Sequence, residues 1–187
     1  MRSCFIFFVG MLVSSGALAQ ATHMSNAHVG LFYPVSTNGR QAATYSNLFS
    51  FHLFEGLSGS ESAFTLSGLV SNIRDSAGGV QIAGLVNTIG GKSSGVQLAG
   101  LVNAGRGHAR GVQVAGLVNT ARGTDGVGLA GLANISHGDS KGLQVAGLVN
   151  CSREVTTQIG GLVNVAGKVK GVQVAGLVNM ADSSDYP

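Results

Sequence analysis

The nine residues Gly111–Asn119 read GVQVAGLVN, and the same nine letters return unchanged at Gly171–Asn179. Neither copy contains a charged residue. The valines alternate with Gln113 and Asn119, and this period of two, rich in β-branched residues, is typical of a strand. Gly116 interrupts the alternation. A glycine inside a strand pattern indicates a bend or a close approach of two backbones.

Close copies of this stretch fill the chain from residue 63 to residue 179. Aligned on the inner glycine, successive copies lie 14 to 16 residues apart, and that glycine is found at Gly68, Gly84, Gly100, Gly116, Gly131, Gly147, Gly161 and Gly176. A short fixed period indicates a repeat architecture, in which each unit packs on its neighbours in the chain.

The segments between the nine-residue cores differ from the cores in length and charge. The cores keep their length, whereas the spacers vary from five to seven residues and contain every charged residue between Arg74 and Lys170. Insertions are tolerated in surface turns and not in packed strands. We therefore expect buried or paired cores that are joined by hydrated turns.

This pattern fits an all-β fold of one of two kinds. In a repeat β-solenoid, about eight coils of 14–16 residues stack in parallel about 4.8 Å apart. Residues 63–179 then form the tandem repeats, and residues 20–62 an N-terminal cap or the first strands. In the alternative, each core is one strand of an antiparallel outer-membrane β-barrel. We favour the solenoid because the intact copies of the core lack the aromatic residues of membrane girdles.

Parallel stacking would place equivalent residues of successive coils directly above one another. Amide side chains suit such columns, since each amide can donate to one neighbour and accept from the other. The sequence therefore predicts a structural repeat ladder in two columns, made of Asn87, Asn103, Asn119, Asn134, Asn150, Asn164 and Asn179, and of Gln81, Gln97, Gln113, Gln144, Gln158 and Gln173.

The first 19 residues form a separate segment. Arg2, the apolar run Phe5–Val13 and the small residues that end at Ala19 have the layout of a secretory signal peptide cleaved after Ala19. Without this leader, Cys151 is expected to stand as a lone thiol. Residues 180–187 are expected to be a C-terminal tail, and their lack of an obvious cap suggests a truncated chain.

The composition argues against several classes of function. Charged residues make up 10% of the chain, and the formal net charge is only +3, without a basic patch of the kind that binds nucleic acid. The acidic residues are scattered. None of the histidines lies at metal-ligand spacing, so we expect surface or turn positions for His23, His28, His52, His108 and His137. We predict a non-enzymatic protein without catalytic residues, cofactor or metal.

Three stretches carry a resemblance to a known family: GLFYPVSTNG at 30–39, FSFHLFEGLSGSESAFTLSGLVSNI at 49–73, and the tandem GVQxAGLVN units. Together they resemble a family of Gram-negative bacterial surface-repeat proteins, over nearly all of the chain after the leader. The resemblance implies export and an envelope location, and it brings no catalytic residues.

The expected function is therefore that of an exported surface-repeat protein with a structural or adhesive role at the bacterial cell envelope. The expected location is the outer membrane or the cell surface, with the periplasm as the alternative. The partner is an unknown envelope or surface component, and an association with the outer membrane is expected. An outer-membrane pore or scaffold is the alternative function, and it would require the barrel fold.

Overall fold

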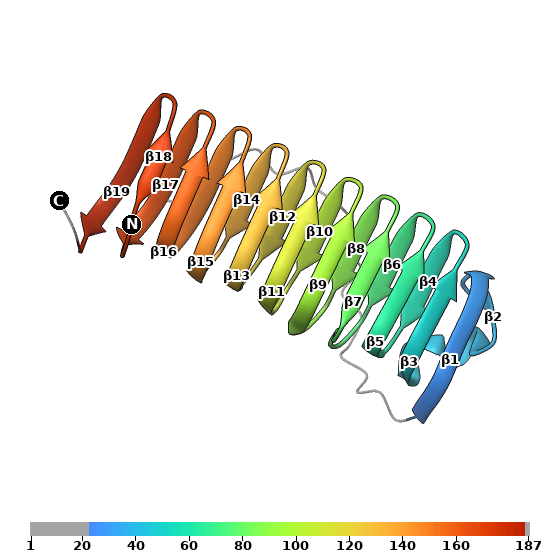
Figure 1. The fold of residues 1–187 in the computed structure, drawn as a ribbon. Coiled ribbons are helices and arrows are strands. Elements are labelled where there is room, and N and C mark those ends of the chain that lie inside the picture. The colour runs from blue at the N-terminus through green and yellow to red at the C-terminus, as the bar shows by residue number, and fades with distance from the viewer. Residues whose placement is uncertain (1–22, 186–187) are drawn as a thin grey trace.

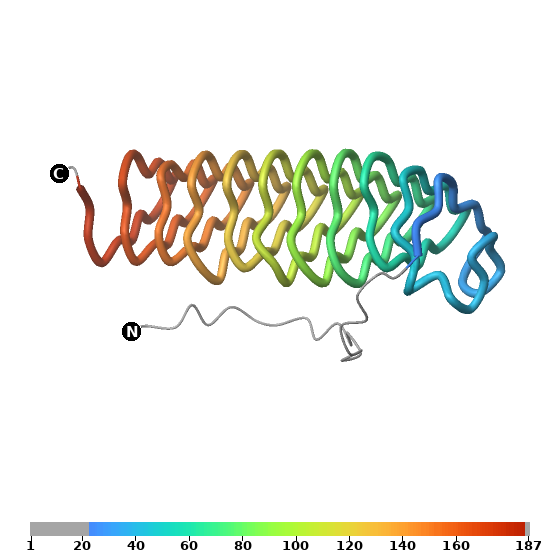
Figure 2. The backbone as a smooth tube through the Cα atoms, turned by 90° about the horizontal axis from the view of Figure 1, so that it is seen from below, coloured from blue at the N-terminus to red at the C-terminus, as the bar shows by residue number. Residues whose placement is uncertain are grey.

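A computed structural model describes residues 23–185 of the chain. The expected signal peptide and its cleavage site therefore lie outside the described residues, as do the last two residues of the expected tail. The described chain winds into a straight rod of about nine stacked turns (Figure 1). Seen from below in Figure 2, the turns follow one another at even spacing.

Each turn contributes two short strands, one on either side of the rod. The elements in chain order are β1 (His23–Phe32), β2 (Val35–Ser36), the 3-10 helix η1 (Gly39–Thr44), β3 (Tyr45–His52), β4 (Glu55–Ser58), β5 (Ser60–Ser67), β6 (Val70–Ile73), β7 (Val80–Ala83), β8 (Val86–Ile89), β9 (Ser93–Ala99), β10 (Val102–Gly105), β11 (His108–Ala115), β12 (Val118–Ala121), β13 (Gly123–Ala130), β14 (Ala133–Ser136), β15 (Asp139–Ala146), β16 (Val149–Gly160), β17 (Val163–Val169), β18 (Gln173–Ala175) and β19 (Val178–Ser184).

The strands form two parallel stacks that face each other across a narrow interior. One stack runs from β1 through β3 and the odd-numbered strands to β15, the second half of β16 and β18. The other runs from β4 through the even-numbered strands to β17 and β19. Among the described residues, only the short β1–β2 pair is antiparallel.

The register within each stack follows the repeat. Asn119 of β12 pairs with Asn103 of β10, and Val112 of β11 pairs with Val127 of β13, so that equivalent positions stack on one another. The predicted β-solenoid is therefore confirmed. The antiparallel alternative is wrong for this chain, because spacers of five to seven residues carry each turn round to the same side and direction.

A typical turn needs two glycines, one because of its backbone conformation and the other because two backbones approach closely. Gly111 has φ of 108°, a left-handed conformation that glycine adopts without strain. Gly116 lies at the bend between β11 and β12, where an added Cβ would lie only 2.0 Å from the carbonyl oxygen of Gly100 in the preceding turn. Stacking thus brings one backbone against another at the bend, and a side chain would prevent it.

The interior of the rod is polar and made of small residues. In a typical turn, Gln113, Ala115, Asn119 and Ala121 are buried, whereas the valines and Leu117 point outward and are half-buried or exposed. The cores are paired with their neighbours, as expected, and only their inward-facing residues are also buried. Two small apolar clusters complete the interior: Ile73, Ala77 and Ile89 toward one end, and Val155, Ala166 and Val169 toward the other.

Stacking begins before the first repeat that the sequence reveals. Strands β3 and β4 already form a turn beneath β5 and β6, and β1 stacks on β3. Strand β2 and η1 cross this end of the rod (Figures 1 and 2). At the opposite end, every residue of β19 is exposed, and the strand runs to Ser184 within the segment expected as a tail.

Two further features concern cysteine and membrane crossing. Cys151 lies buried on β16. The expectation about its thiol depends on removal of Cys4 with the leader, and residue 4 lies outside the described residues. Among residues 23–185, no helix has the length and apolar character needed to cross a membrane.

Candidate functional site

The predicted asparagines lie in one continuous column inside the rod. From Asn87 to Asn164, each Nδ2 donates to Oδ1 of the asparagine in the next turn at 2.9–3.0 Å, and the column ends at Asn179. Each of these Nδ2 atoms also donates to a backbone carbonyl in the next turn, as Asn119 does to Leu129 at 2.7 Å. The amides therefore connect neighbouring turns and satisfy carbonyl groups beside the bend.

The predicted glutamines form a column that is interrupted. Gln113 donates to Gln97 at 2.8 Å, Gln158 donates to Gln144 at 3.0 Å, and Gln173 donates to Gln158 at 2.8 Å. Gly128 occupies this column between Gln113 and Gln144, which breaks the chain of amides. At the start of the column, Gln81 Nε2 donates to the carbonyl of Gly78 within its own turn.

The outside of the rod carries a continuous apolar surface, here called the apolar face. Its crest follows the bends between the two stacks and is a row of exposed leucines, here called the leucine ridge: Leu69, Leu85, Leu101, Leu117, Leu132, Leu148, Leu162 and Leu177. Columns of apolar residues flank the ridge on both sides. Two that are set by strand register run Leu66–Ile82–Leu98–Val114–Leu129–Val145–Ile159–Val174 and Val70–Val86–Val102–Val118–Ala133–Val149–Val163–Val178, and in the second column Val86 is buried.

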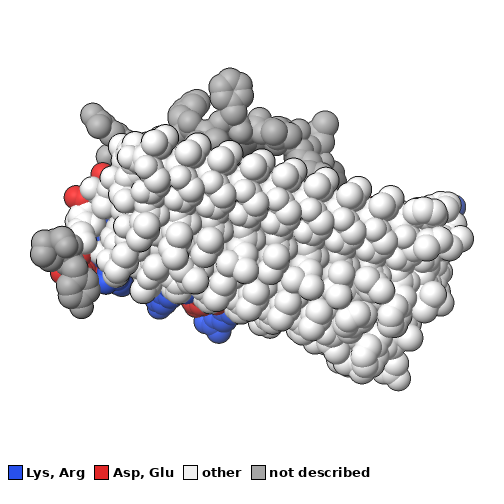
Figure 3. All heavy atoms as spheres, turned by 45° about the horizontal axis from the view of Figure 1, so that its top comes forward, with Lys and Arg blue, Asp and Glu red and all other residues white. Residues whose placement is uncertain are grey.

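This face is large and uncharged. Figure 3 shows it as an almost unbroken white surface along the rod, with charged residues gathered at its margin. The seven residues Val112–Val118 make the face about 23 Å wide, measured along the chain, and eight turns spaced about 4.8 Å apart give its length. The product of the two is an area of roughly 900 Å². The largest apolar patch of a typical soluble monomer covers only about 300–600 Å². The apolar face therefore needs a functional explanation.

Aromatic residues extend the apolar face at the N-terminal end. Phe51 is 44% exposed and stacks directly before Leu66, while Phe49 stacks before Phe64. Phe54 precedes Leu69 at the start of the leucine ridge, where its carbonyl accepts from the Leu69 N–H. Exposed phenylalanines at one end of an apolar surface are typical of contact sites, because each of them buries a large area on binding.

The opposite edge of the rod, made by the spacers and here called the charged edge, carries ion pairs between neighbouring turns. Arg153 Nε lies 3.0 Å from Asp139 Oδ1, and its hydrogen bond holds the pKa of the Asp139 carboxyl below its usual range. Asp125 contacts both His108 and Arg110, at 3.2 and 3.6 Å. Exposed pairs of this kind add little stability. Because these ion pairs lie on the edge opposite the apolar face, the rod is amphipathic across its width.

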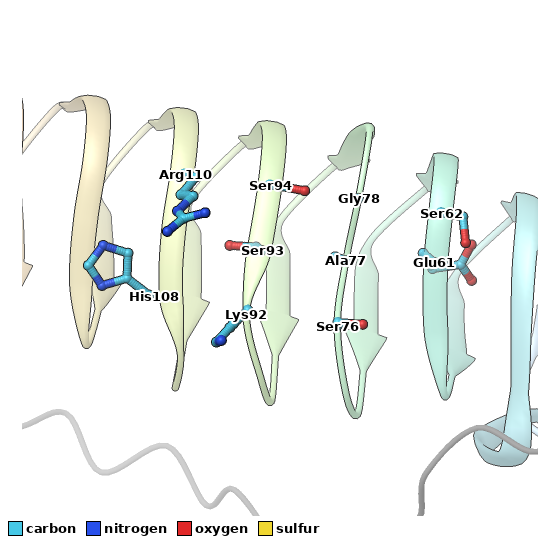
Figure 4. Close-up of a pocket in the computed structure, with 10 residues that line it drawn as sticks. All are labelled: Glu61, Ser62, Ser76, Ala77, Gly78, Lys92, Ser93, Ser94, His108 and Arg110. Atoms are coloured by element: carbon cyan, nitrogen blue, oxygen red, sulfur yellow. The ribbon is translucent and has the colours of Figure 1, made fainter.

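A depression of about 420 Å³ lies over the spacers of four consecutive turns (Figure 4). It is lined by Glu61, Ser62, Ser76, Ala77, Gly78, Lys92, Ser93, Ser94, His108 and Arg110. Asp125 forms an ion pair with Arg110 and lies 3.2 Å from His108 Nε2. None of the described hydrogen bonds joins a lining serine to His108 or Glu61. The depression therefore presents serine hydroxyl groups beside Lys92 and Arg110.

A second polar cluster is enclosed at the N-terminal end. His28 of β1 and His52 of β3 are 1% and 6% exposed, and His52 Nε2 lies 3.2 Å from His28 Nδ1. Glu61 of β5 is 2% exposed and accepts at Oε1 from Asn47 Nδ2 at 3.0 Å and from Ser50 Oγ at 2.7 Å. The expectation of surface or turn histidines is wrong for His28 and His52, because each faces the interior from its strand.

Burial governs the protonation of this cluster. It lowers the pKa of His28 to about 4, and burial together with the neighbouring His28 lowers the pKa of His52 to about 4. Burial also raises the pKa of Glu61, against the opposing effect of its hydrogen bonds. Each shift favours the neutral form, since a charge is costly in a low-dielectric interior.

The contact between His28 Nε2 and Ser36 Oγ, at 3.0 Å, invites comparison with a nucleophile and its base. A general base must hold an unprotonated nitrogen toward the hydroxyl group. Asn47 Nδ2 lies 3.5 Å from His28 Nδ1, but it has two closer acceptors, Ser58 Oγ at 3.1 Å and Glu61 Oε1 at 3.0 Å, for its two hydrogens. His28 is only 1% exposed, so its ring is closed to a substrate in solution.

No group of three or more His, Cys, Asp or Glu side chains among the described residues could hold a metal ion. The enclosed cluster and the apolar face were both missed in the sequence. The column that holds Gln81 in later turns holds His28, Ser50 and Thr65 in the first ones. Alternation of polar and apolar residues over 49–52 was the available signal, and it places His52 on the same side as Ser50.

Comparison with known proteins finds no protein-family model, no curated protein and no solved structure that matches this chain. The candidate functional surface therefore rests on geometry alone. Of the features described, the apolar face with its leucine ridge is the largest and the most accessible.

Proposed function

We propose that this chain is an exported, non-enzymatic surface-repeat protein that acts as a structural or adhesive rod at the bacterial cell envelope and binds through its apolar face. The observation that carries the proposal is the size of this face, roughly 900 Å² without a charged residue from residue 63 onward. The rings of His28 and His52 are enclosed at 1% and 6% exposure, so a substrate in solution has no access to them.

The stacked interior supports a structural role. Backbone pairing and the asparagine column join each turn to the next, and these contacts suit a rigid rod that displays one surface along its length. A pore is not proposed, since it would require the antiparallel closed fold that this chain does not adopt.

Export and exposure can be tested in a Gram-negative host that expresses the full chain with an epitope tag at its C-terminus. We expect envelope fractionation, a mature N-terminus at Gln20 and accessibility of the tag or chain to protease added to intact cells. The matched control is Ala19→Arg, which should block cleavage and leave Met1 in place. A chain that stays in the cytoplasm at full length would sink the proposal.

A further inference from the structure

We propose that the leucine ridge binds a lipid surface and inserts into the boundary between headgroups and acyl chains. This inference rests on the proposed function and names the partner of the apolar face. The ridge leucines are about 40% exposed in the middle of the rod. With Phe54, which stacks before Leu69, the ridge is about 38 Å long, since its residues are about 4.8 Å apart.

The shape of the ridge favours a fluid occupant. The leucines lie on a narrow bend, and the flanking columns of Val114 and Val118 lie on opposite stacks of the rod. A flat protein surface could cover one side or the other, and two ridges would touch along a single row of leucines. A stable dimer needs about 800 Å² from each partner. Lipid chains can fill both flanks at once.

The repetition of the ridge leads to the same occupant. Each turn presents nearly the same residues, as Leu101 and Val102 are followed one turn later by Leu117 and Val118. A protein partner could slip by one turn, about 4.8 Å, and find almost the same contacts. Such a surface therefore specifies no register, and a lipid surface requires none.

The polarity of the rod matches the depth of the membrane boundary. Amphipathic elements that lie on a bilayer bury their apolar side by about 5–10 Å. From the ridge, Leu117 is followed on one flank by Val118 and then by the more polar Thr120 and the charged Arg122. A rod lying on its ridge would place leucines and valines within the boundary and keep the charged edge in water.

Binding is tested with vesicles and with the chain that begins at Gln20, which keeps every described strand and removes the apolar run Phe5–Val13. We expect the chain to float with vesicles of phosphatidylcholine alone and of phosphatidylcholine with phosphatidylglycerol at a ratio of about 7:3, because the contact is apolar. The triple variant Leu101→Gln, Leu117→Gln, Leu132→Gln should lower the partition coefficient at least about tenfold.

The matched control removes three charges from the opposite edge: Arg106→Gln, Arg122→Gln and Lys141→Gln. It should change partition into phosphatidylcholine by less than about twofold, since these residues face water in the proposed orientation. Circular dichroism checks that both triple variants retain their strands. Equal loss in the two variants, or absence of flotation by the unmodified chain, would overturn the inference.

A single indole gives a measurement that does not depend on binding strength, because the chain contains no tryptophan. Leu117→Trp should shift its emission to the blue on vesicles and be quenched by brominated acyl chains, whereas Arg122→Trp should not. Quenching that is equal at both positions contradicts the orientation. A lipid-free dimer that the three leucine changes dissociate, seen by sedimentation, would identify a second copy as the occupant and reject lipid.

Failure here is distinguishable from failure of the proposed function. An exported, surface-exposed chain that ignores vesicles would reject the lipid surface and leave the envelope rod standing. A chain retained in the cytoplasm would reject the envelope rod whatever its behaviour on vesicles.

Discussion

At the scale of single residues, the asparagine column makes each amide depend on the copies before and after it. Asn119 Oδ1 accepts from Asn103 at 2.9 Å, while its Nδ2 donates to Asn134 and to the Leu129 carbonyl. Asn87, which begins the column, shows the cost of a missing neighbour: Ser71 precedes it, and its buried Oδ1 has no partner. A buried asparagine is therefore fully hydrogen-bonded only where the turns before and after it also carry an asparagine in the same column.

Replacing Asn119 by Leu should lower the free energy of unfolding by about 1–3 kcal/mol, because the amides and carbonyl that Asn119 contacts lose their partner in a buried site. Urea unfolding followed by circular dichroism measures the change. The control is Asn179→Leu at the exposed end of the column, where one bond from Asn164 is lost. A cost at Asn119 no larger than that at Asn179 would contradict a stabilising column.

The glycine at the bend allows an equally direct comparison. Gly116→Ala should cost at least about 3 kcal/mol, since its Cβ would lie 2.0 Å from the Gly100 carbonyl oxygen, an atom of the backbone that cannot turn away. Gly105→Ala is the control, because its Cβ would meet nothing closer than 3.6 Å. We expect this change to be neutral or to stabilise by up to about 1 kcal/mol. Thermal melts of the two variants decide the matter.

At the scale of elements, the first strands combine a polar interior with titratable groups. His28 on β1 and His52 on β3 face Glu61 on β5, and no charged side chain of β4 is buried beside them, since Glu55 is exposed. The histidines have a pKa of about 4 in the folded chain and an ordinary value of 6.5 when unfolded. Between these values the unfolded chain binds more protons, so stability falls as the pH falls.

We therefore expect the free energy of unfolding to decrease from pH 6.5 toward pH 4. The double variant His28→Gln, His52→Ser should weaken this pH dependence. The replacements are chosen from the same columns of the rod, where Gln81 occupies the position of His28 and Ser67 that of His52 in later turns. Urea unfolding at pH 7.5, 6 and 5 measures the slope. Identical slopes in both proteins would show that the histidines are not responsible.

Glu61 should act in the opposite direction. Its raised pKa means that the folded chain binds more protons than the unfolded chain above about pH 4.5, which adds stability as the pH falls. Glu61→Gln removes this contribution, so its loss of stability toward acid pH should be steeper than that of the unmodified chain.

The repeat strands could be predicted from the sequence because each copy carries the same local signals. Val112 and Gln113 alternate, Gly116 marks the bend, and the spacers carry the charge. The turn formed by β3 and β4 was not predicted as a repeat, because Phe51, His52 and Glu55 replace the residues that define the motif. Its alternation survives, and only the register with β5 identifies it as a turn of the rod.

The apolar face could not be predicted because alternation does not say which side of a strand faces inward. Burial of valine and exposure of glutamine is the ordinary arrangement, and this chain reverses it. The reversal follows from the narrow interior: the amides of Gln113 and Asn119 bond to their copies, whereas valine and leucine gain nothing special from stacking in register. Long-range pairing thus decides the orientation.

At the scale of the whole molecule, the rod is a sum of turns that contact only their neighbours. Strand β12 pairs with β10 and β14, and β11 pairs with β9 and β13. In such a molecule, stability is close to a sum of terms for each turn and for each contact between turns. Whole turns should therefore be removable without loss of the fold, provided that the register of the remaining residues is kept.

Deletion of residues 104–119 removes 16 residues and joins Asn103 to Thr120. Asn103 then takes the place of Asn119 beneath Asn134, and Leu101 takes the place of Leu117 on the leucine ridge, so both columns continue. We expect a folded rod that is shorter by about 4.8 Å in its largest dimension, as measured by small-angle X-ray scattering.

Deletion of residues 112–119 is the control: it removes half a turn, brings Gly111 to Thr120 and leaves the following strands on the wrong stack. That variant should lose the cooperative unfolding transition, because bend glycines, amides and leucines no longer meet their copies. If the whole-turn deletion unfolds as readily as the half-turn deletion, the contacts between neighbouring turns are not what specifies the rod.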